Sequence, residues 1–481
     1  MARLILLFGI TVSSLSPLSG GNVSGDVLHI PLPASEVSLD PTAIQDQSSL
    51  LVSRQINCQL VRMRQGKVEP EAIESYRFLS PTEIEMVLGT RFTFHDGSQI
   101  QAEDVIATFE SLRKSRSVLR NIFDWVKNVE AVAPNRVVFR LTREVPHFLK
   151  ALSAPNQAVM KKGFLEKAAR EPALWKKPLG CGRYQVTESN GTTINISPTR
   201  PGPLPIVFHL RGGKSITATE LESFDLVGFS LAPAGAALPS KFRAEKSFDP
   251  YHLFLGLNYQ LPQWKDRETR CRYFASLDRG PVFDQYGADA EPAKDLVPRG
   301  VIGYLPKVDY PAALKKDHGQ FQPRQQVECL TFLSVSVPEN RRAGYEKMVK
   351  ADGHPLTVKV IEQPKHFGPQ FQKLKCDAMV LGLKSNYLDA YEYILLFSEN
   401  DANFTGYHNE DLKHHIKMSQ NEEDSTKKAE IYQSILGKIR DACLIYPVAT
   451  LPMRSTWVKQ GRQTPGLGQV SLNEYYLGDI R

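Results

Sequence analysis

The sequence predicts an α/β protein, and two observations carry that prediction. Between about residue 253 and residue 450, short apolar runs with strand character alternate with amphipathic stretches of helical length. Upstream, residues 83–112 read as a strand, a tight turn and the start of a helix. Alternating strands and helices indicate a largely parallel sheet. A chain of 481 residues is long enough for two or more domains with sizeable cores.

The N-terminus predicts a secretory signal peptide. Met1-Ala-Arg3 is a short basic start, Leu4–Val12 is mostly apolar, and Ser13–Gly25 is small and polar. The apolar part is shorter than the ~20 residues that cross a bilayer, and the layout is that of an export signal. A buried first strand is the alternative. We predict residues 1–25 as the signal peptide. Because no cysteine lies near the cleavage region, we expect a soluble exported protein without a lipid anchor.

The first elements predicted after the signal are a strand at 27–30 and a helix at 50–60. A second strand is indicated further along the chain. Ile84, Met86 and Leu88 alternate with the residues between them, and this period of two predicts a strand with one apolar face.

A turn and a helix follow this strand. Asp96-Gly97 is turn chemistry, because glycine accepts the positive φ that a Cβ atom penalises. Val105, Ile106 and Phe109 come at helical spacing, after acidic residues that stand where the helix dipole favours anions. The stretch therefore predicts a β-turn-α unit.

The later elements follow from the same two periodicities and from turn residues between them. They are a hairpin at 130–142 around Pro134-Asn135, strands at 253–258, 329–337, 356–362 and 377–383, and helices at 267–284, 340–351, 367–374 and 424–440.

Charge and composition argue against a nucleic-acid partner. The net charge is +7, but the basic residues are spread along the chain, whereas nucleic-acid binding usually needs a concentrated basic patch. A hydrophobic share of 42% and a charged share of 23% are ordinary for a soluble globular chain.

The sequence contains incomplete matches to a metal motif and to a phosphate-binding motif. His414-His415 is the only adjacent histidine pair, and no second set of ligands stands at helical spacing from it, which indicates a surface helix. Gly212-Gly213-Lys214-Ser215 resembles a phosphate loop, but Phe208 stands where the motif needs glycine. We therefore predict neither an enzyme nor a metal or cofactor site.

Six cysteines are widely spaced, without a Cys-x-x-Cys pair, and their spacing leaves the connectivity open. One pair follows from the predicted strands. Cys329 immediately precedes the apolar run Leu330–Val337, and Cys376 immediately precedes the run that begins at Asp377. If these runs are neighbouring parallel strands, both cysteines stand at matching strand starts, within reach of a disulfide.

Several segments follow one family pattern in order along the chain. They are Leu39-Asp40-Pro41, Phe92–Phe109, Val129–Phe139, Pro178–Tyr184, Arg270–Arg279 and Asn403–Asn409. Together they resemble the extracellular (periplasmic) solute-binding proteins of family 5, the oligopeptide-, dipeptide- and nickel-binding components of ABC transporters.

This resemblance implies a fold and a function. The fold is the two-lobe periplasmic-binding-protein fold with a hinge. Lobe I is expected at 26–253 plus 454–481, with an inserted subdomain at 61–180, and lobe II at 254–453. The function implied is capture of an oligopeptide or peptide-like solute in the interlobe cleft, by a monomer in the periplasm, for delivery to membrane permease subunits.

The family's cleft segments give the expected site. In peptide-binding members, one segment carries a tryptophan and an acidic residue that pairs with the peptide's α-ammonium group. Here Leu383 and Asn386 stand at those places, and an amide lacks the charge that makes such a contact strong. Asp389 substitutes if the loop shifts. The resemblance implies ligand contacts at Ser49, Leu383, Asn386, Tyr387, Asp389 and Tyr407.

The two departures keep alternatives open. The same fold is compatible with a nickel chelate, haem or a sugar as cargo. A sensor or scaffold that uses the fold without transport is the alternative of a different class.

Overall fold

The computed structural model describes most of the chain. The described residues are 26–44, 46–64, 67–114, 125–145, 148–228, 231, 237–286, 290–334, 336–337, 339–362, 367–384, 389–397, 403–422, 424–467 and 475–481. The predicted signal peptide, residues 1–25, lies outside them.

A four-stranded sheet carries the first strand. Its order is β1 (Leu28–Leu32), β10 (Ile206–Leu210), β9 (Thr193–Pro198) and β8 (Tyr184–Ser189). β1 and β10 are parallel, and the other pairs are antiparallel. The strand predicted at 27–30 is thus confirmed as β1. The predicted helix at 50–60 is α1 (Gln47–Ile56), which begins earlier because Asp46 caps it.

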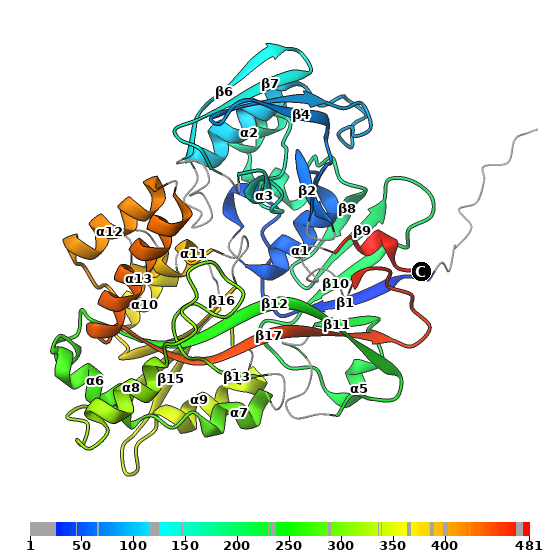
Figure 1. The fold of residues 1–481 in the computed structure, drawn as a ribbon. Coiled ribbons are helices and arrows are strands. Elements are labelled where there is room, and N and C mark those ends of the chain that lie inside the picture. Colours follow the sequence, from blue (N-terminus) through cyan, green and yellow to red (C-terminus); the bar gives the residue numbers. More distant parts are fainter. Residues whose placement is uncertain are drawn as a thin grey trace, which may run out of the picture.

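A larger sheet fills the other half of the molecule (Figure 1). Its order is β11 (Leu226–Gly228), β17 (Ile445–Lys459), β12 (Phe242–Leu257), β16 (Ala378–Lys384), β14 (Cys329–Leu333) and β15 (Thr357–Ile361), with β13 (Glu291–Pro292) beside β17.

The prediction of a largely parallel sheet is wrong for this large sheet. Only the pairs that β14 makes with β15 and β16 are parallel. The pairs that involve β12 or β17 are antiparallel. Alternation along the chain shows which segments are strands, but strand direction depends on which strands become neighbours. Here two long strands, β12 and β17, meet across almost 200 residues of sequence and were not expected as partners.

An antiparallel sheet lies at the top of Figure 1, in the order β4 (Ile73–Ser80), β5 (Glu83–Leu88), β7 (Arg136–Leu141) and β6 (Val126–Ala133). A small hairpin, β2 (Val61–Arg64) and β3 (Lys67–Pro70), adjoins it. The hairpin predicted around Pro134-Asn135 is confirmed as β6–β7. α2 (Ala102–Lys114) packs on this sheet, and the rings of Phe109 and Phe139 meet edge to face at 4.9 Å.

The remaining helices are grouped by place. α3 (Phe148–Leu152) and α4 (Lys162–Ala168) belong to the upper part, and α5 (Ala218–Leu221) precedes β11. Those around the large sheet are α6 (Arg267–Ser276), α7 (Gly280–Tyr286), α8 (Tyr310–His318), α9 (Arg342–Val349), α10 (Phe367–Leu374), α11 (Tyr391–Ile394), α12 (Glu410–Asn421) and α13 (Ser425–Asp441). Short 3-10 turns occur at 41–43, 172–176, 262–264, 339–341, 395–397 and 477–479.

One predicted helix is two helices in the structure. The stretch 267–284 breaks after Ser276, where Leu277 takes an extended conformation. The side chain of Asp278 then accepts a hydrogen bond from the backbone N–H of Gly280 at 3.0 Å. Such a local bond competes with the helix and starts α7 in a new direction. The strand predicted at 253–258 is only the last part of β12, which begins at Phe242. The other predicted elements of this region are present with bounds shifted by a few residues.

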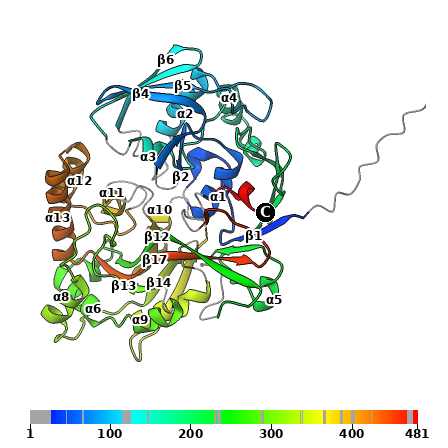
Figure 2. The ribbon, with the colours of Figure 1, turned by 45° about the vertical axis from the view of Figure 1, so that its right-hand side comes forward.

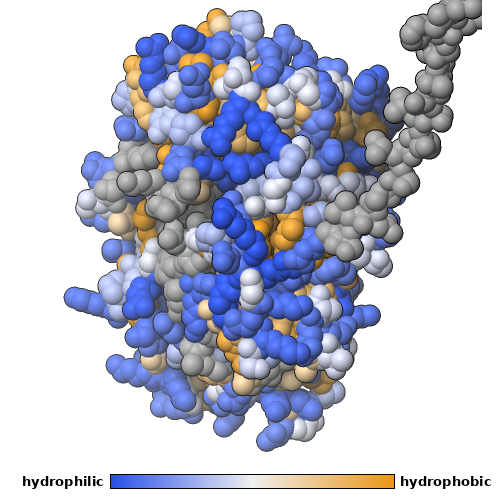
Figure 3. Space-filling view, turned by 90° about the vertical axis from the view of Figure 1, so that its right-hand side faces the viewer, coloured by the Kyte–Doolittle hydropathy of each residue, from blue (hydrophilic) through white to orange (hydrophobic). Residues whose placement is uncertain are grey.

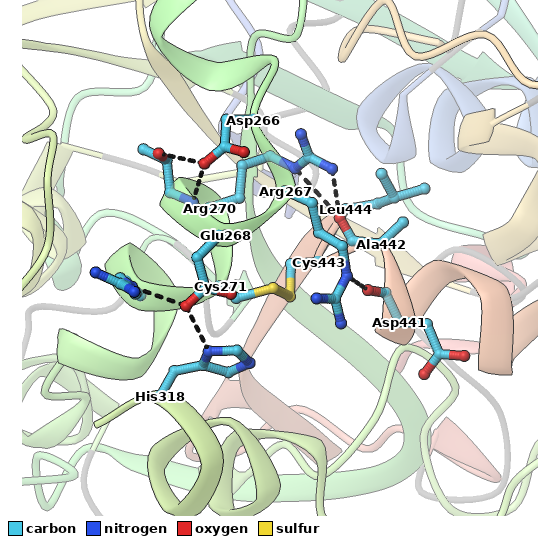
Figure 4. Close-up of a disulfide and its surroundings, with 12 residues drawn as sticks. Asp266, Arg267, Glu268, Arg270, Cys271, His318, Asp441, Ala442, Cys443 and Leu444 are labelled. Carbon is cyan, nitrogen blue, oxygen red and sulfur yellow. Dashed lines mark hydrogen bonds and ion pairs between the residues drawn. A yellow bond between two sulfur atoms is a disulfide. The ribbon is translucent and has the colours of Figure 1, made fainter. Parts of the chain in front are cut away.

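The three disulfides pair all six cysteines. Cys329–Cys376 confirms the predicted pair, with 4.8 Å between the two Cα atoms at the starts of β14 and β16. Cys58–Cys181 and Cys271–Cys443 were not predicted. The second of these joins α6 to the turn between α13 and β17, as Figure 4 shows. Beside it, Arg270 donates from Nη2 to the carbonyl of Ala442 at 2.7 Å, so a polar contact reinforces the same junction.

β12 and β17 extend from the part of the molecule that holds α6 and α8 to the part that holds β1 and β11 (Figures 1 and 2). Their pairing register shifts between Leu253 and Phe254. The predicted lobe boundaries at 253/254 and 453/454 fall inside these two strands. The division into lobes stays a prediction.

Candidate functional site

Two sets of parallel strands point their carboxyl ends toward each other. One set is β1 and β10, which end at Leu32 and Leu210. The other set is β14, β15 and β16 of the large sheet. The segments that leave these ends touch. The Ser35 hydroxyl donates to the carbonyl of Glu362 at 3.4 Å, and the N–H of Glu339 donates to the carbonyl of Gly213 at 3.1 Å. In open α/β sheets, ligands bind at such carboxyl ends. We call this junction the strand-end site.

Gly213 allows the close approach at this junction. Its φ is +75°, a conformation that side chains disfavour. A Cβ atom there would lie 3.3 Å from Nη2 of Arg342 and 3.4 Å from Cβ of Ser334. The Gly-Gly pair that resembles a phosphate loop therefore acts as a contact between the two sheets.

Arg342 places a half-buried positive charge at the strand-end site. Its Nε donates to the carbonyl of Val337 at 3.1 Å, and its guanidinium lies over the ring of Phe332. Burial lowers the pKa of Arg342, and the carboxylates of Glu362 and Glu339 oppose this. Across the described ranges, no acidic side chain forms an ion pair with it. The guanidinium is therefore available to an anionic group.

Sequence reasoning missed Arg342. A signal was present, because α9 begins at Arg342 and carries no acidic residue in its first turn. The helix dipole disfavours a cation at that end. A cation in an unfavourable place at the start of a helix is a reasonable indicator of a binding role.

Leu383 lies at the carboxyl end of β16, where it pairs with His252 and is half-buried against the core of the large sheet. Its neighbour Gly382 is crowded by Tyr251, whose hydroxyl donates to the carbonyl of Ser336 at 3.2 Å. The structure thus brings Leu383 to the strand-end site. Asn386 and Tyr387 lie outside the described residues.

Asp389 is buried and already engaged. The Tyr432 hydroxyl and the Tyr391 N–H donate to its Oδ1, and Nζ of Lys428 lies 3.8 Å from its Oδ2. Burial raises the pKa of Tyr432, and so does the neighbouring Asp389, so the hydroxyl remains a donor. A ligand ammonium group would have to compete with these partners.

Ser49 belongs to the cap of α1. It is fully buried, its hydroxyl donates to Asp46, and it accepts from the N–H of Ser38 at 2.9 Å. Burial raises the pKa of Asp46, although the bonds from Ser49 oppose this. Ser49 therefore fixes the loop that carries Ser35 toward Glu362. Ser49 itself lies behind that loop.

Tyr407 lies at the other end of β16. Its ring contacts the ring of Tyr259. Tyr259 comes shortly after Leu257, and Leu257 pairs with Ala378 at the start of β16. Leu383 is five residues further along the strand, roughly 17 Å away at the usual rise per residue. The structure therefore leaves Tyr407 apart from Leu383.

Comparisons with known proteins identify relatives of this chain. The model of bacterial extracellular solute-binding proteins, family 5 (middle), matches residues 67–196. A putative ABC transporter peptide-binding protein of Brucella ovis is 22% identical over 307 residues. Residues 67–196 are thus similar to the family 5 solute-binding proteins. The match covers 57% of this chain and 56% of the Brucella relative, so it spans only about half of either protein.

Solved binding proteins from bacteria have the same fold. The murein tripeptide binding protein MppA of Escherichia coli has a TM-score of 0.80 and 14% identity, covering 94% of this chain and 97% of its own. AgaA of A. tumefaciens R10, solved with agropinic acid, has a TM-score of 0.77 and 18% identity, covering 95% and 98%. The predicted two-lobe periplasmic-binding-protein fold is confirmed.

Two further findings concern the described part of the chain. No helix in it has the length and apolar character needed to cross a membrane. No three side chains of the His, Cys, Asp or Glu type gather there in a way that would hold a metal ion.

Proposed function

We propose that this protein captures a peptide or peptide-like solute at the strand-end site and delivers it to an ABC importer. The family supports the solute-binding role, and the Brucella relative, whose name specifies peptides, supports the class of cargo. We further propose that it does so outside the cytoplasm and without catalysis, as the family description implies.

The main observation behind this proposal is that two sets of strand ends face each other around Arg342. Two surfaces that close on a polar solute expel water, and hydrogen bonds between them then count for more. The solute shifts the population toward the closed form only through its preference for that form. A permease can then distinguish the loaded protein from the empty one.

Within the site, we propose that Arg342 binds a ligand carboxylate, while Leu383, Asn386 and Tyr387 contact the rest. Asp389 is less available to a ligand, since Tyr432 and Lys428 already occupy it. Recognition would then rest on the acidic end of the solute more than on its amino end.

The same reasoning favours a second candidate, an acidic solute that is not a peptide. Arg342 supplies the cation, and Asn386 does not supply the anion that an α-ammonium group needs. AgaA, whose structure contains agropinic acid, provides a precedent among the relatives.

The test compares peptides that differ only at the carboxyl end. Native mass spectrometry of the protein from its exporting host first identifies any co-purified solute. Calorimetry then compares a short peptide with its C-terminal amide, using wild type, Arg342→Gln and, as a matched loss of one charge on the same helix, Lys347→Gln. Lys347 is exposed on α9.

We expect wild type and K347Q to prefer the free carboxylate by at least about tenfold, and R342Q to lose that preference. An equal preference in all three proteins would contradict the role of Arg342. If no peptide binds but acidic solutes do, the second candidate holds. If neither peptides nor acidic solutes bind, the transport proposal fails and the sensor alternative is favoured.

A further inference from the structure

A second hollow lies away from the strand-end site. It is a cavity of about 530 Å³, walled by three segments: 91–97 after β5, 181–185 at the start of β8, and 199–203 between β9 and β10. This volume is within the usual range for small-molecule sites. The cavity adjoins the edge of the first sheet where β10 begins, whereas the strand-end site adjoins the edge where β10 ends. The two sites are therefore distinct.

The charged side chains that line this cavity are all positive. Arg91, Arg183 and Arg200 line it, and no carboxylate does. None of the three forms an ion pair with an acidic residue among those the structure describes. The nearby carboxylate of Asp96 is taken by Nζ of Lys161 at 2.6 Å. Guanidinium groups without an acidic partner around a concave surface favour an anion.

One arginine is held in place. The Arg183 guanidinium lies 4.6 Å from the ring centroid of Tyr476 and is half-buried. A stacked guanidinium loses less freedom when it binds an anion, because its plane is already fixed. Arg91 and Arg200 are exposed and supply charge at the rim.

A histidine helps to hold the wall of the cavity together. Nε2 of His95 lies 3.1 Å from the carbonyl of Gly182, while its Nδ1 is buried and has no partner. Burial lowers the pKa of His95, although the bond to Gly182 opposes this. The neutral ring donates from Nε2 and ties the segment at 91–97 to the segment at 181–185.

The walls are tied together before any ligand arrives. The N–H of His95 donates to the carbonyl of Gly180 at 2.9 Å, and the N–H of Thr199 donates to the carbonyl of Arg183 at 2.8 Å. The disulfide from Cys58 to Cys181 anchors the middle segment. A preformed site spares a ligand the ordering cost of building it.

We propose that this cavity binds a small organic anion, such as a carboxylate or a sugar phosphate. The face that carries β8 and β9 is mostly hydrophilic in Figure 3. All three walls of the cavity lie within residues 91–203, so its lining includes no residue of the strand-end site. The inference does not rest on the proposed function.

The test measures anion binding by calorimetry at low and at 0.2 M salt. Citrate and glucose 6-phosphate probe the two sources of charge, and glucose is the neutral control. The variant Arg91→Gln/Arg200→Gln removes two exposed charges with little risk to folding, and Arg183→Gln removes the stacked one. Lys315→Gln/Lys316→Gln on α8 is the matched control for charge, since both lysines are exposed and far from the cavity wall.

We expect one anion to bind per protein, with affinity at least about tenfold lower in R91Q/R200Q and in R183Q and unchanged in K315Q/K316Q. Binding should persist in R342Q, which places it outside the strand-end site. Several results would overturn the inference: no binding of either anion at millimolar concentration, equal binding of glucose, an equal loss in the lysine control, or a loss in R342Q.

Discussion

The disulfide between Cys271 and Cys443 offers a quantitative test of the lobe organisation. The change is Cys271→Ala/Cys443→Ala, which removes the bond without burying a new polar group. The bond closes a loop of 172 residues, and in the chain-entropy description a loop of that length stabilises the fold by roughly 5 kcal/mol. The contacts that Arg270 makes to Ala442 remain, so the junction keeps part of its structure (Figure 4).

The melting temperature turns this free energy into a test of cooperativity. If residues 254–453 unfold as one unit of about 200 residues, their unfolding entropy is roughly 0.4 kcal/mol/K, and the loss of 5 kcal/mol lowers Tm by about 10 °C. If the whole chain unfolds together, the entropy is more than twice as large and the decrease is correspondingly smaller, about 5 °C. Differential scanning calorimetry of the oxidised proteins measures both the shift and the enthalpy. A shift below about 1 °C would refute the stabilising role of this bond.

Two further predictions concern single residues. Burial raises the pKa of Asp96, but the hydrogen bonds from Lys161 and Ser98 together outweigh it and hold the pKa at about 2; the resulting stability is therefore present above pH 3.8 and is lost as pH falls toward 2. Because Asp96 is 40% exposed, Asp96→Asn should cost at most ~1 kcal/mol in urea unfolding at pH 7 and nothing near pH 2; a cost that persists near pH 2 would contradict the ion-pair explanation. Gly213→Ala should cost ~1–2 kcal/mol and weaken solute binding, because it combines a positive φ with contact to Arg342, whereas Gly353→Ala has the φ without the contact; equal effects on binding would count against the junction.

The upper sheet was predictable because its signals are local. The apolar face of Ile84 and Met86 meets Val105 and Phe109 of the helix only about 20 residues on, and periodicity fixes both faces before any tertiary contact forms. The disulfide between Cys329 and Cys376 was predictable for a similar reason, since both cysteines start strands that the apolar runs define.

The large sheet and the site were less predictable because they depend on distant partners. β12 and β17 pair across almost 200 residues of sequence, so their relative direction is not encoded in either strand. Asp389 looks like a ligand contact in the sequence, yet Lys428 and Tyr432, about 40 residues away, occupy it. Arg342 belongs to no sequence motif, and its proposed role depends on the surface that it faces in the folded protein.

The three disulfides share a property that concerns motion. Cys58–Cys181 lies entirely within residues 26–253, and both other bonds lie entirely within residues 254–453. No covalent bridge therefore spans the two predicted lobes; only the polypeptide connects them. The three disulfides therefore stiffen each predicted lobe separately and add no covalent constraint on the position of one lobe relative to the other.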